Sequence, residues 1–134
     1  MPPKDLETAL LLRRTKEIEL FPKVKTFLHS IERNSIRSKR SYSSGLTLLQ
    51  NFLKAKEQQI KYEGCYNCDT VLQPLFENRI NVYELFDSLI SHILATKPEI
   101  TPRSLSLYIS AVKSYFAYYD IVPNKHDRPV SNVY

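Results

Sequence analysis

The sequence is poor in the residues and patterns that several classes of protein require. It contains two glycines, two cysteines and no tryptophan among 134 residues. An all-β domain would need more glycine for its tight turns, and a disulfide-stabilised secreted domain would need more cysteine. No stretch approaches the roughly 18 apolar residues that cross a bilayer, and residues 1–4 lack the apolar core of a signal peptide. We therefore expect a cytoplasmic protein that has no membrane-spanning segment.

The side chains that would form a catalytic or metal centre are also scarce. The three histidines, His29, His92 and His126, have no partner pattern that suggests a nucleophile and its base. Cys65 and Cys68 have the spacing of half a zinc site, but no second pair of ligands follows. We expect no cofactor and no catalysis from this chain. For the two cysteines an ordinary pair in a loop is the favoured interpretation, beside a metal or redox role and an intermolecular site.

What the sequence does contain is typical of one helical domain. Hydrophobic residues make up 43% and charged residues 25% of the chain, which is ordinary for a globular protein. Apolar side chains recur at spacings of three and four, which predicts one weaker and four strong helices: residues 4–16, and then 18–33, 38–58, 81–96 and 101–119. We therefore expect an all-α bundle of four to five helices.

Local signals place the starts of these helices. Pro22 must lie in the first turn of its helix, where a missing N–H costs little. Ser38 and Asn81 are candidate N-caps. The clearest start is Thr101 followed by Pro102, an N-cap with proline at the first helical position.

Positive charge is concentrated in one part of the chain. The formal net charge is +5. Residues 33–61 contain seven lysines and arginines against a single glutamate, whereas residues 62–98 contain two cations against five acids. This asymmetry favours a polyanionic partner.

The basic segment is combined with short polar side chains on one helix face. At about 100° per residue, the side of the 38–58 helix opposite its apolar stripe carries Arg37, Arg40, Ser44, Thr47 and Asn51, with Lys39 and Ser43 on its flanks. The helix of residues 101–119 has a similar start, with Thr101, Arg103 and Ser104, and with Lys113 toward one flank. Arginines, hydroxyls and helix N-termini all bind phosphates or base edges. The pattern predicts a surface for double-stranded DNA, the other interpretation being a solvated basic face.

Two stretches resemble a known family. Residues 35–42, Ser-Ile-Arg-Ser-Lys-Arg-Ser-Tyr, are followed by leucines and a phenylalanine at positions 46, 49, 52 and 53. This stretch resembles the second helix of the N-terminal core-binding domain of tyrosine recombinases, the phage-type integrases. Residues 100–116, with their capped start and leucine–aromatic ridge, resemble a later helix of that domain. The resemblance spans about residues 21–121.

The resemblance implies a SAM-like helical bundle that binds one side of a recombination site. By position it implies DNA contacts from Lys39, Arg40, Ser43, Arg103 and Ser104. The family's catalytic domain needs two arginines, a His-x-x-Arg element and a nucleophilic tyrosine, and no histidine here has arginine three residues later.

We therefore expect the core-binding domain over residues 1–122, with an N-terminal extension helix in 1–17. Residues 123–134 are expected to be a linker toward a separate catalytic domain of the same recombinase. Further partners would be double-stranded DNA and other recombinase protomers bound to it. The alternative is a helical protein-interaction module without affinity for DNA. The long connection from about residue 59 to residue 80 and its two cysteines depart from the family pattern.

Overall fold

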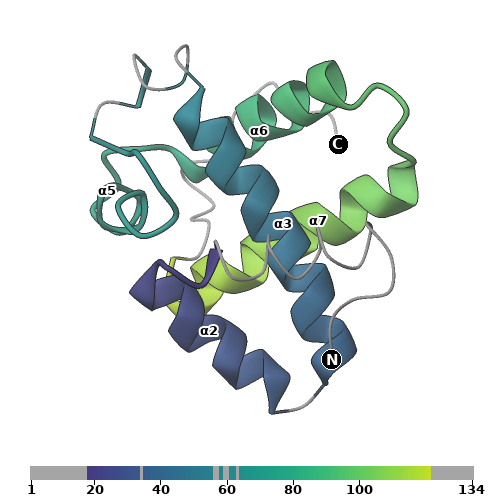
Figure 1. The fold of residues 1–134 in the computed structure, drawn as a ribbon. Coiled ribbons are helices and arrows are strands. Elements are labelled where there is room, and N and C mark those ends of the chain that lie inside the picture. The colour runs from purple at the N-terminus through teal and green to yellow at the C-terminus, as the bar shows by residue number, and fades with distance from the viewer. Residues whose placement is uncertain (1–17, 34, 56–57, 59–60, 63, 122–134) are drawn as a thin grey trace.

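The structure is a computed structural model, which describes residues 18–33, 35–55, 58, 61–62 and 64–121. Within these residues it contains no strand, and its helices (Figure 1) are α2 (Pro22–Glu32), α3 (Ile36–Lys54), α5 (Leu72–Phe76), α6 (Val82–Thr96) and α7 (Pro102–Tyr118). The predicted all-α class is confirmed. The helix predicted over residues 4–16, the residue-122 boundary and the 123–134 linker lie outside the described residues.

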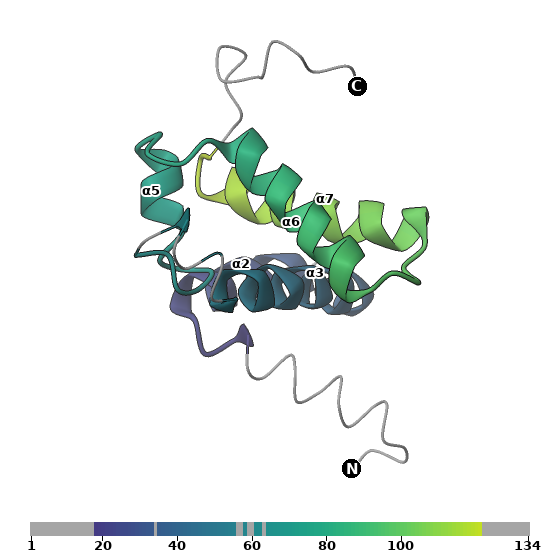
Figure 2. The same ribbon diagram turned by 90° about the horizontal axis from the view of Figure 1, so that it is seen from above.

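The helices form two layers. Figure 2 shows α2 and α3 in one layer, α6 and α7 in the other, and α5 at one end. The apolar faces meet between the layers, where the largest fully buried side chains include Tyr115, Phe27, Phe52 and Phe116. Burial of this apolar surface is the main force that stabilises such a bundle.

The helix starts follow local capping chemistry, with one correction. Pro22 and Pro102 occupy the first turns of α2 and α7, and the side chains of Asn81 and Thr101 cap α6 and α7, as predicted. The N-cap of α3 is Ser35 rather than Ser38, because the Ser35 hydroxyl accepts the Ser38 N–H at 3.2 Å. Helix α3 therefore begins at Ile36 instead of the predicted residue 38. It ends at Lys54 instead of the predicted residue 58.

Two leucines, Leu20 and Leu94, fit the apolar spacing of the predicted helices 18–33 and 81–96 but are exposed. Leu20 is 78% exposed because α2 begins only at Pro22, so residue 20 precedes the helix. Leu94 is 46% exposed near the end of α6. The apolar faces of both helices are therefore shorter than the spacing suggested.

The connection between α3 and α6 is held to the bundle by polar contacts with three helices. Cys68 N–H donates to Gln50 Oε1 of α3 at 3.0 Å, and the Tyr115 hydroxyl of α7 donates to the Cys68 carbonyl at 2.8 Å. Asp69 Oδ2 accepts the Lys23 N–H at 3.2 Å. Since no side chain at the N-cap of α2 makes a capping bond, Asp69 satisfies an N–H group that the helix start would otherwise leave without a partner.

A close crossing of α3 over α7 sets the relation between the two layers (Figure 1). A Cβ atom built on Gly45 of α3 would lie 2.8 Å from Ala111 Cβ and 2.9 Å from the Tyr108 carbonyl oxygen. Only glycine therefore fits at this point with the backbones as they are. The crossing places the middle of α3 beside the first half of α7, where the predicted site residues lie.

Candidate nucleic-acid interface

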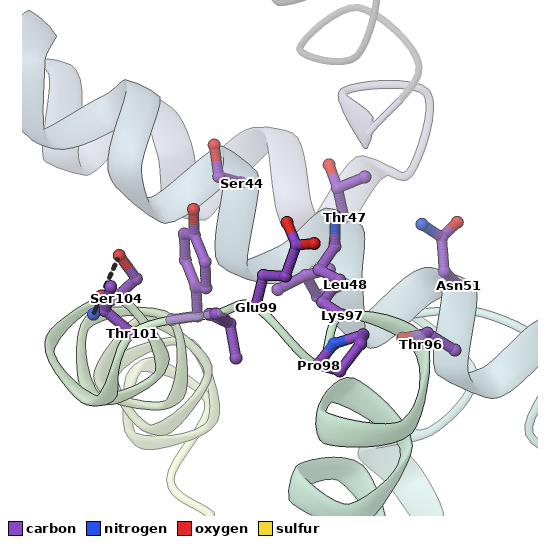
Figure 3. A pocket seen from close by; sticks show the side chains of 12 residues that line it. Ser44, Thr47, Leu48, Asn51, Thr96, Lys97, Pro98, Glu99, Thr101 and Ser104 are labelled. Carbon is purple, nitrogen blue, oxygen red and sulfur yellow. Dashed lines mark hydrogen bonds between the residues drawn. The ribbon is translucent and has the colours of Figure 1, made fainter.

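A cleft forms where the middle of α3 faces the start of α7. It encloses about 690 Å³. Its walls are Ser44, Thr47, Leu48 and Asn51 of α3, Thr96 at the end of α6, residues 97–100 of the α6–α7 connection, and Thr101, Ser104 and Tyr108. Figure 3 shows Ser44, Thr47 and Asn51 along one wall and Thr101 and Ser104 on another. The fold thus brings together four of the predicted site residues: Ser44, Thr47, Thr101 and Ser104.

The hydroxyl groups of the α3 wall are oriented by the helix itself. Ser44 Oγ donates to the Arg40 carbonyl at 3.1 Å, and Thr47 Oγ1 donates to the Ser43 carbonyl at 2.8 Å. Each hydroxyl proton is therefore directed back to the helix. The oxygen lone pairs remain available to accept from a ligand.

The start of α7 forms the opposite wall and exposes an arginine. Thr101 Oγ1 accepts the Ser104 N–H at 3.1 Å and lies 3.0 Å from Ser104 Oγ. Arg103 stands exposed next to this cap. Capping accounts for Thr101, but Arg103 has no ion-pair partner within the described residues. The positive end of a helix dipole and a guanidinium thus coincide.

Two arginines of α3 extend the polar face beyond the cleft. Arg40 precedes Ser44 by one helical turn, and Arg37 precedes Arg40 by nearly another. Both side chains are exposed, and among the described residues neither takes part in an ion pair. Their charge is available to an anionic ligand that runs along α3.

Lys39 is placed differently from its predicted role. Its ammonium lies 2.7 Å from Glu19 Oε1 and 3.3 Å from Glu32 Oε2, and only 16% of its side chain is exposed. The hydrogen bond to Glu19 raises the pKa of Lys39 above its ordinary value of 10.5. Two carboxylates therefore neutralise this cation, so Lys39 links α3 to the residues around α2 instead of presenting charge to a ligand.

Ser43 and Lys113 also lie apart from the cleft. Ser43 is 2% exposed, so its predicted position on the exposed flank of the helix is wrong. The reason is that α3 packs against both α2 and α7, which buries a wider arc than a single apolar stripe. Lys113 is exposed, but its ammonium lies over the Phe86 ring of α6 at 5.8 Å from the centroid, away from the cleft walls.

Sequence reasoning missed two charged residues of the cleft, Lys97 and Glu99. They flank Pro98 in the α6–α7 connection, and both are exposed. The signal was present in the sequence, because a charged pair directly precedes the capped start of α7. The location of Lys97 and Glu99 on the wall that faces α3 depends on the turn between α6 and α7.

The cysteines are buried side chains of the core. Cys68 is fully buried, and its thiol donates to the Leu46 carbonyl at 3.5 Å, while Cys65 is 1% exposed. Burial raises the pKa of both thiols above the ordinary value. In the part of the chain that the structure describes, no cluster of three or more histidine, cysteine or acidic side chains could hold a metal ion. The favoured interpretation of an ordinary pair in a loop fits this placement.

Two further findings bear on function. None of the helices described here is both long and apolar enough to cross a membrane. Comparison with protein-family models, curated proteins and solved structures gives no match. A functional assignment must therefore come from the residues and their arrangement.

Proposed function

We propose that this chain is the double-stranded DNA-binding domain of a site-specific tyrosine recombinase, in which a separate domain cleaves and joins the strands. The observation that supports it is the cleft between α3 and α7, where the predicted polar residues of two helices meet. Both helices also carry exposed arginines, Arg37 and Arg40 on α3 and Arg103 on α7. The resemblance of residues 35–53 and 100–116 to helices of the core-binding domain supports the recombinase assignment.

The arrangement suits a duplex because it combines charge with neutral hydrogen-bonding groups. Arginine guanidinium groups bind phosphate bidentately and keep their charge at any physiological pH. Ser44, Thr47 and Asn51 line the cleft and are short enough for a base edge to approach α3. The proposed partners are therefore the DNA duplex, the catalytic domain of the same recombinase, and other protomers on the DNA.

The first test measures binding to a fluorescent 25-base-pair duplex by anisotropy at several salt concentrations. Three phosphate contacts, one for each arginine, give an expected slope of about −2.7 for log affinity against log salt, a loss of about 40-fold between 50 and 200 mM. Replacing Arg37, Arg40 and Arg103 with glutamine should weaken binding and lower that slope by about one per cation removed.

A charge-matched control separates this surface from net charge. Lys23, Lys61 and Arg79 contact Tyr119, Ser88 and Glu77 respectively, none of which lines the cleft. Their triple glutamine variant loses the same three charges, and it should retain most of the affinity. Equal losses in the two variants would contradict the assigned surface, and no binding by the parent protein at low salt would contradict the function.

A helical protein-interaction module is the second candidate, and one observation favours it. Leu107 is 55% exposed on the outward side of α7, one turn after Arg103. An exposed apolar side chain has no favourable partner on a phosphate backbone, whereas a protein partner could pack against it. This candidate predicts no affinity for duplex DNA at low salt, so the same titration distinguishes the two.

A further inference from the structure

The α6–α7 connection places two opposite charges at the cleft without pairing them. Lys97 and Glu99 both line it, on either side of Pro98. Within the described residues no ion pair joins them or engages either one. Figure 3 shows the Glu99 carboxylate directed toward α3, between Ser44 and Thr47. A positively charged donor, Lys97, and a negatively charged acceptor, Glu99, thus lie near each other on the proposed DNA surface.

Three hydroxyl groups of the same cleft act as acceptors as well. The hydroxyl groups of Ser44, Thr47 and Thr96 all donate their protons to backbone carbonyls of their own helices. For Thr96 the acceptors are the carbonyls of His92 and Ile93. What these side chains offer to a ligand is their oxygen lone pairs. A phosphate placed against Glu99 would be repelled by its carboxylate and would find no donor among these three hydroxyls. The complementary group is therefore a neutral hydrogen-bond donor.

We propose that Glu99 and Lys97 read one C·G base pair in the major groove, an inference that rests on the proposed DNA-binding function. Glu99 would accept a hydrogen bond from the cytosine N4 amino group, and Lys97 would donate to guanine O6 and N7. The arginines outside the cleft would hold the flanking phosphates. Phosphate contacts position the protein, and this pair of side chains supplies sequence selectivity.

The chemistry of the base edges selects cytosine over adenine. The adenine amino group lies beside N7, an acceptor that repels a carboxylate, whereas cytosine offers its amino group without a neighbouring acceptor on the same base. The paired guanine then presents two acceptors that match the Lys97 ammonium. A T·A pair in this orientation presents O4 and a methyl group to Glu99 and leaves Lys97 a single acceptor, adenine N7.

The test compares the affinities of the parent protein, Glu99→Gln and Glu84→Gln for 25-base-pair duplexes made only of G·C pairs and only of A·T pairs. The parent should bind the G·C duplex more tightly, by roughly 5- to 150-fold. Glu99→Gln should shift the preference toward the A·T duplex, because a glutamine amide binds adenine N6 and N7 together. Glu84 is exposed in the first turn of α6 and is not a cleft residue; Glu84→Gln removes the same charge and should leave the preference unchanged.

The outcomes separate this inference from the function beneath it. DNA binding with no preference, or a preference that Glu99→Gln leaves unchanged while affinity rises for all sequences, would overturn the base-pair assignment and leave DNA binding intact. An equal shift in Glu84→Gln would also overturn it. If the parent protein binds no duplex at low salt, the proposed function fails and the inference fails with it.

Discussion

Substitution of Gly45 by alanine tests the helix crossing that forms the cleft. The new Cβ would meet Ala111 Cβ at 2.8 Å and the Tyr108 carbonyl oxygen at 2.9 Å. Both distances are shorter than ordinary van der Waals contact. The carbonyl belongs to the backbone of α7, so no side-chain rotation can relieve this contact. Helices α3 and α7 must move apart, or the substitution must strain them.

Two opposing effects set the size of the change. Alanine is favoured over glycine inside a helix by up to about 1 kcal/mol. Overpacking a well-packed interior costs about 1 to 3 kcal/mol. Because one of the two clashes involves backbone, we place the overpacking cost in the upper half of that range. The expected result is a net loss of about 1 to 2 kcal/mol in the free energy of unfolding.

The assay is urea denaturation followed by far-ultraviolet circular dichroism, run as a double-mutant cycle with Ala111→Gly. The double variant removes one of the two clashes, so the effects should be non-additive by at least about 0.5 kcal/mol. Ala117→Gly, at an exposed position of α7, measures how much a glycine lowers the free energy of unfolding in that helix when no packing contact is involved. A Gly45→Ala protein as stable as its parent, or strictly additive effects in the cycle, would refute the close crossing.

Three further predictions concern the contacts around α2 and the thiols. Asp69→Ala should lower the free energy of unfolding by about 1 kcal/mol, because the Lys23 N–H loses its acceptor; in urea denaturation Asp69→Asn should lose less, and equal losses would contradict the capping role. The Cys65 and Cys68 thiols should react with a thiol reagent at pH 8 only as urea unfolds the protein, because burial raises the pKa of both; rapid labelling without urea would contradict this. Lys39→Gln should cost about 0.5 kcal/mol at pH 8. Because the pKa of Lys39 is raised in the folded protein, its stabilising effect is complete below pH 10.5 and is lost as the pH rises through the folded-state pKa. If the melting temperatures of the parent and Lys39→Gln stay equally far apart up to pH 12, the ion pair is contradicted.

Local sequence signals were enough to locate the four long helices α2, α3, α6 and α7, but not the short helix α5. Helical spacing and caps depend on residues within about four positions of one another, so Pro22, Asn81 and Thr101 could be located without coordinates. The same periodicity placed Ser44 and Thr47 on one side of α3. Even the misplaced start at Ser38 was a local error, since the true N-cap Ser35 bonds to its N–H.

Which of these polar residues are available to a ligand depends on packing between remote parts of the chain. Lys39 is neutralised by Glu19 and Glu32, and Ser43 is buried, because α3 packs against two helices at once. Asp69 caps a helix that begins far earlier in the chain. Such contacts join residues remote in sequence, and no local pattern encodes which remote segments will meet. The placement of Glu99 opposite α3 has the same origin, because it depends on the angle at which α7 crosses beneath Gly45.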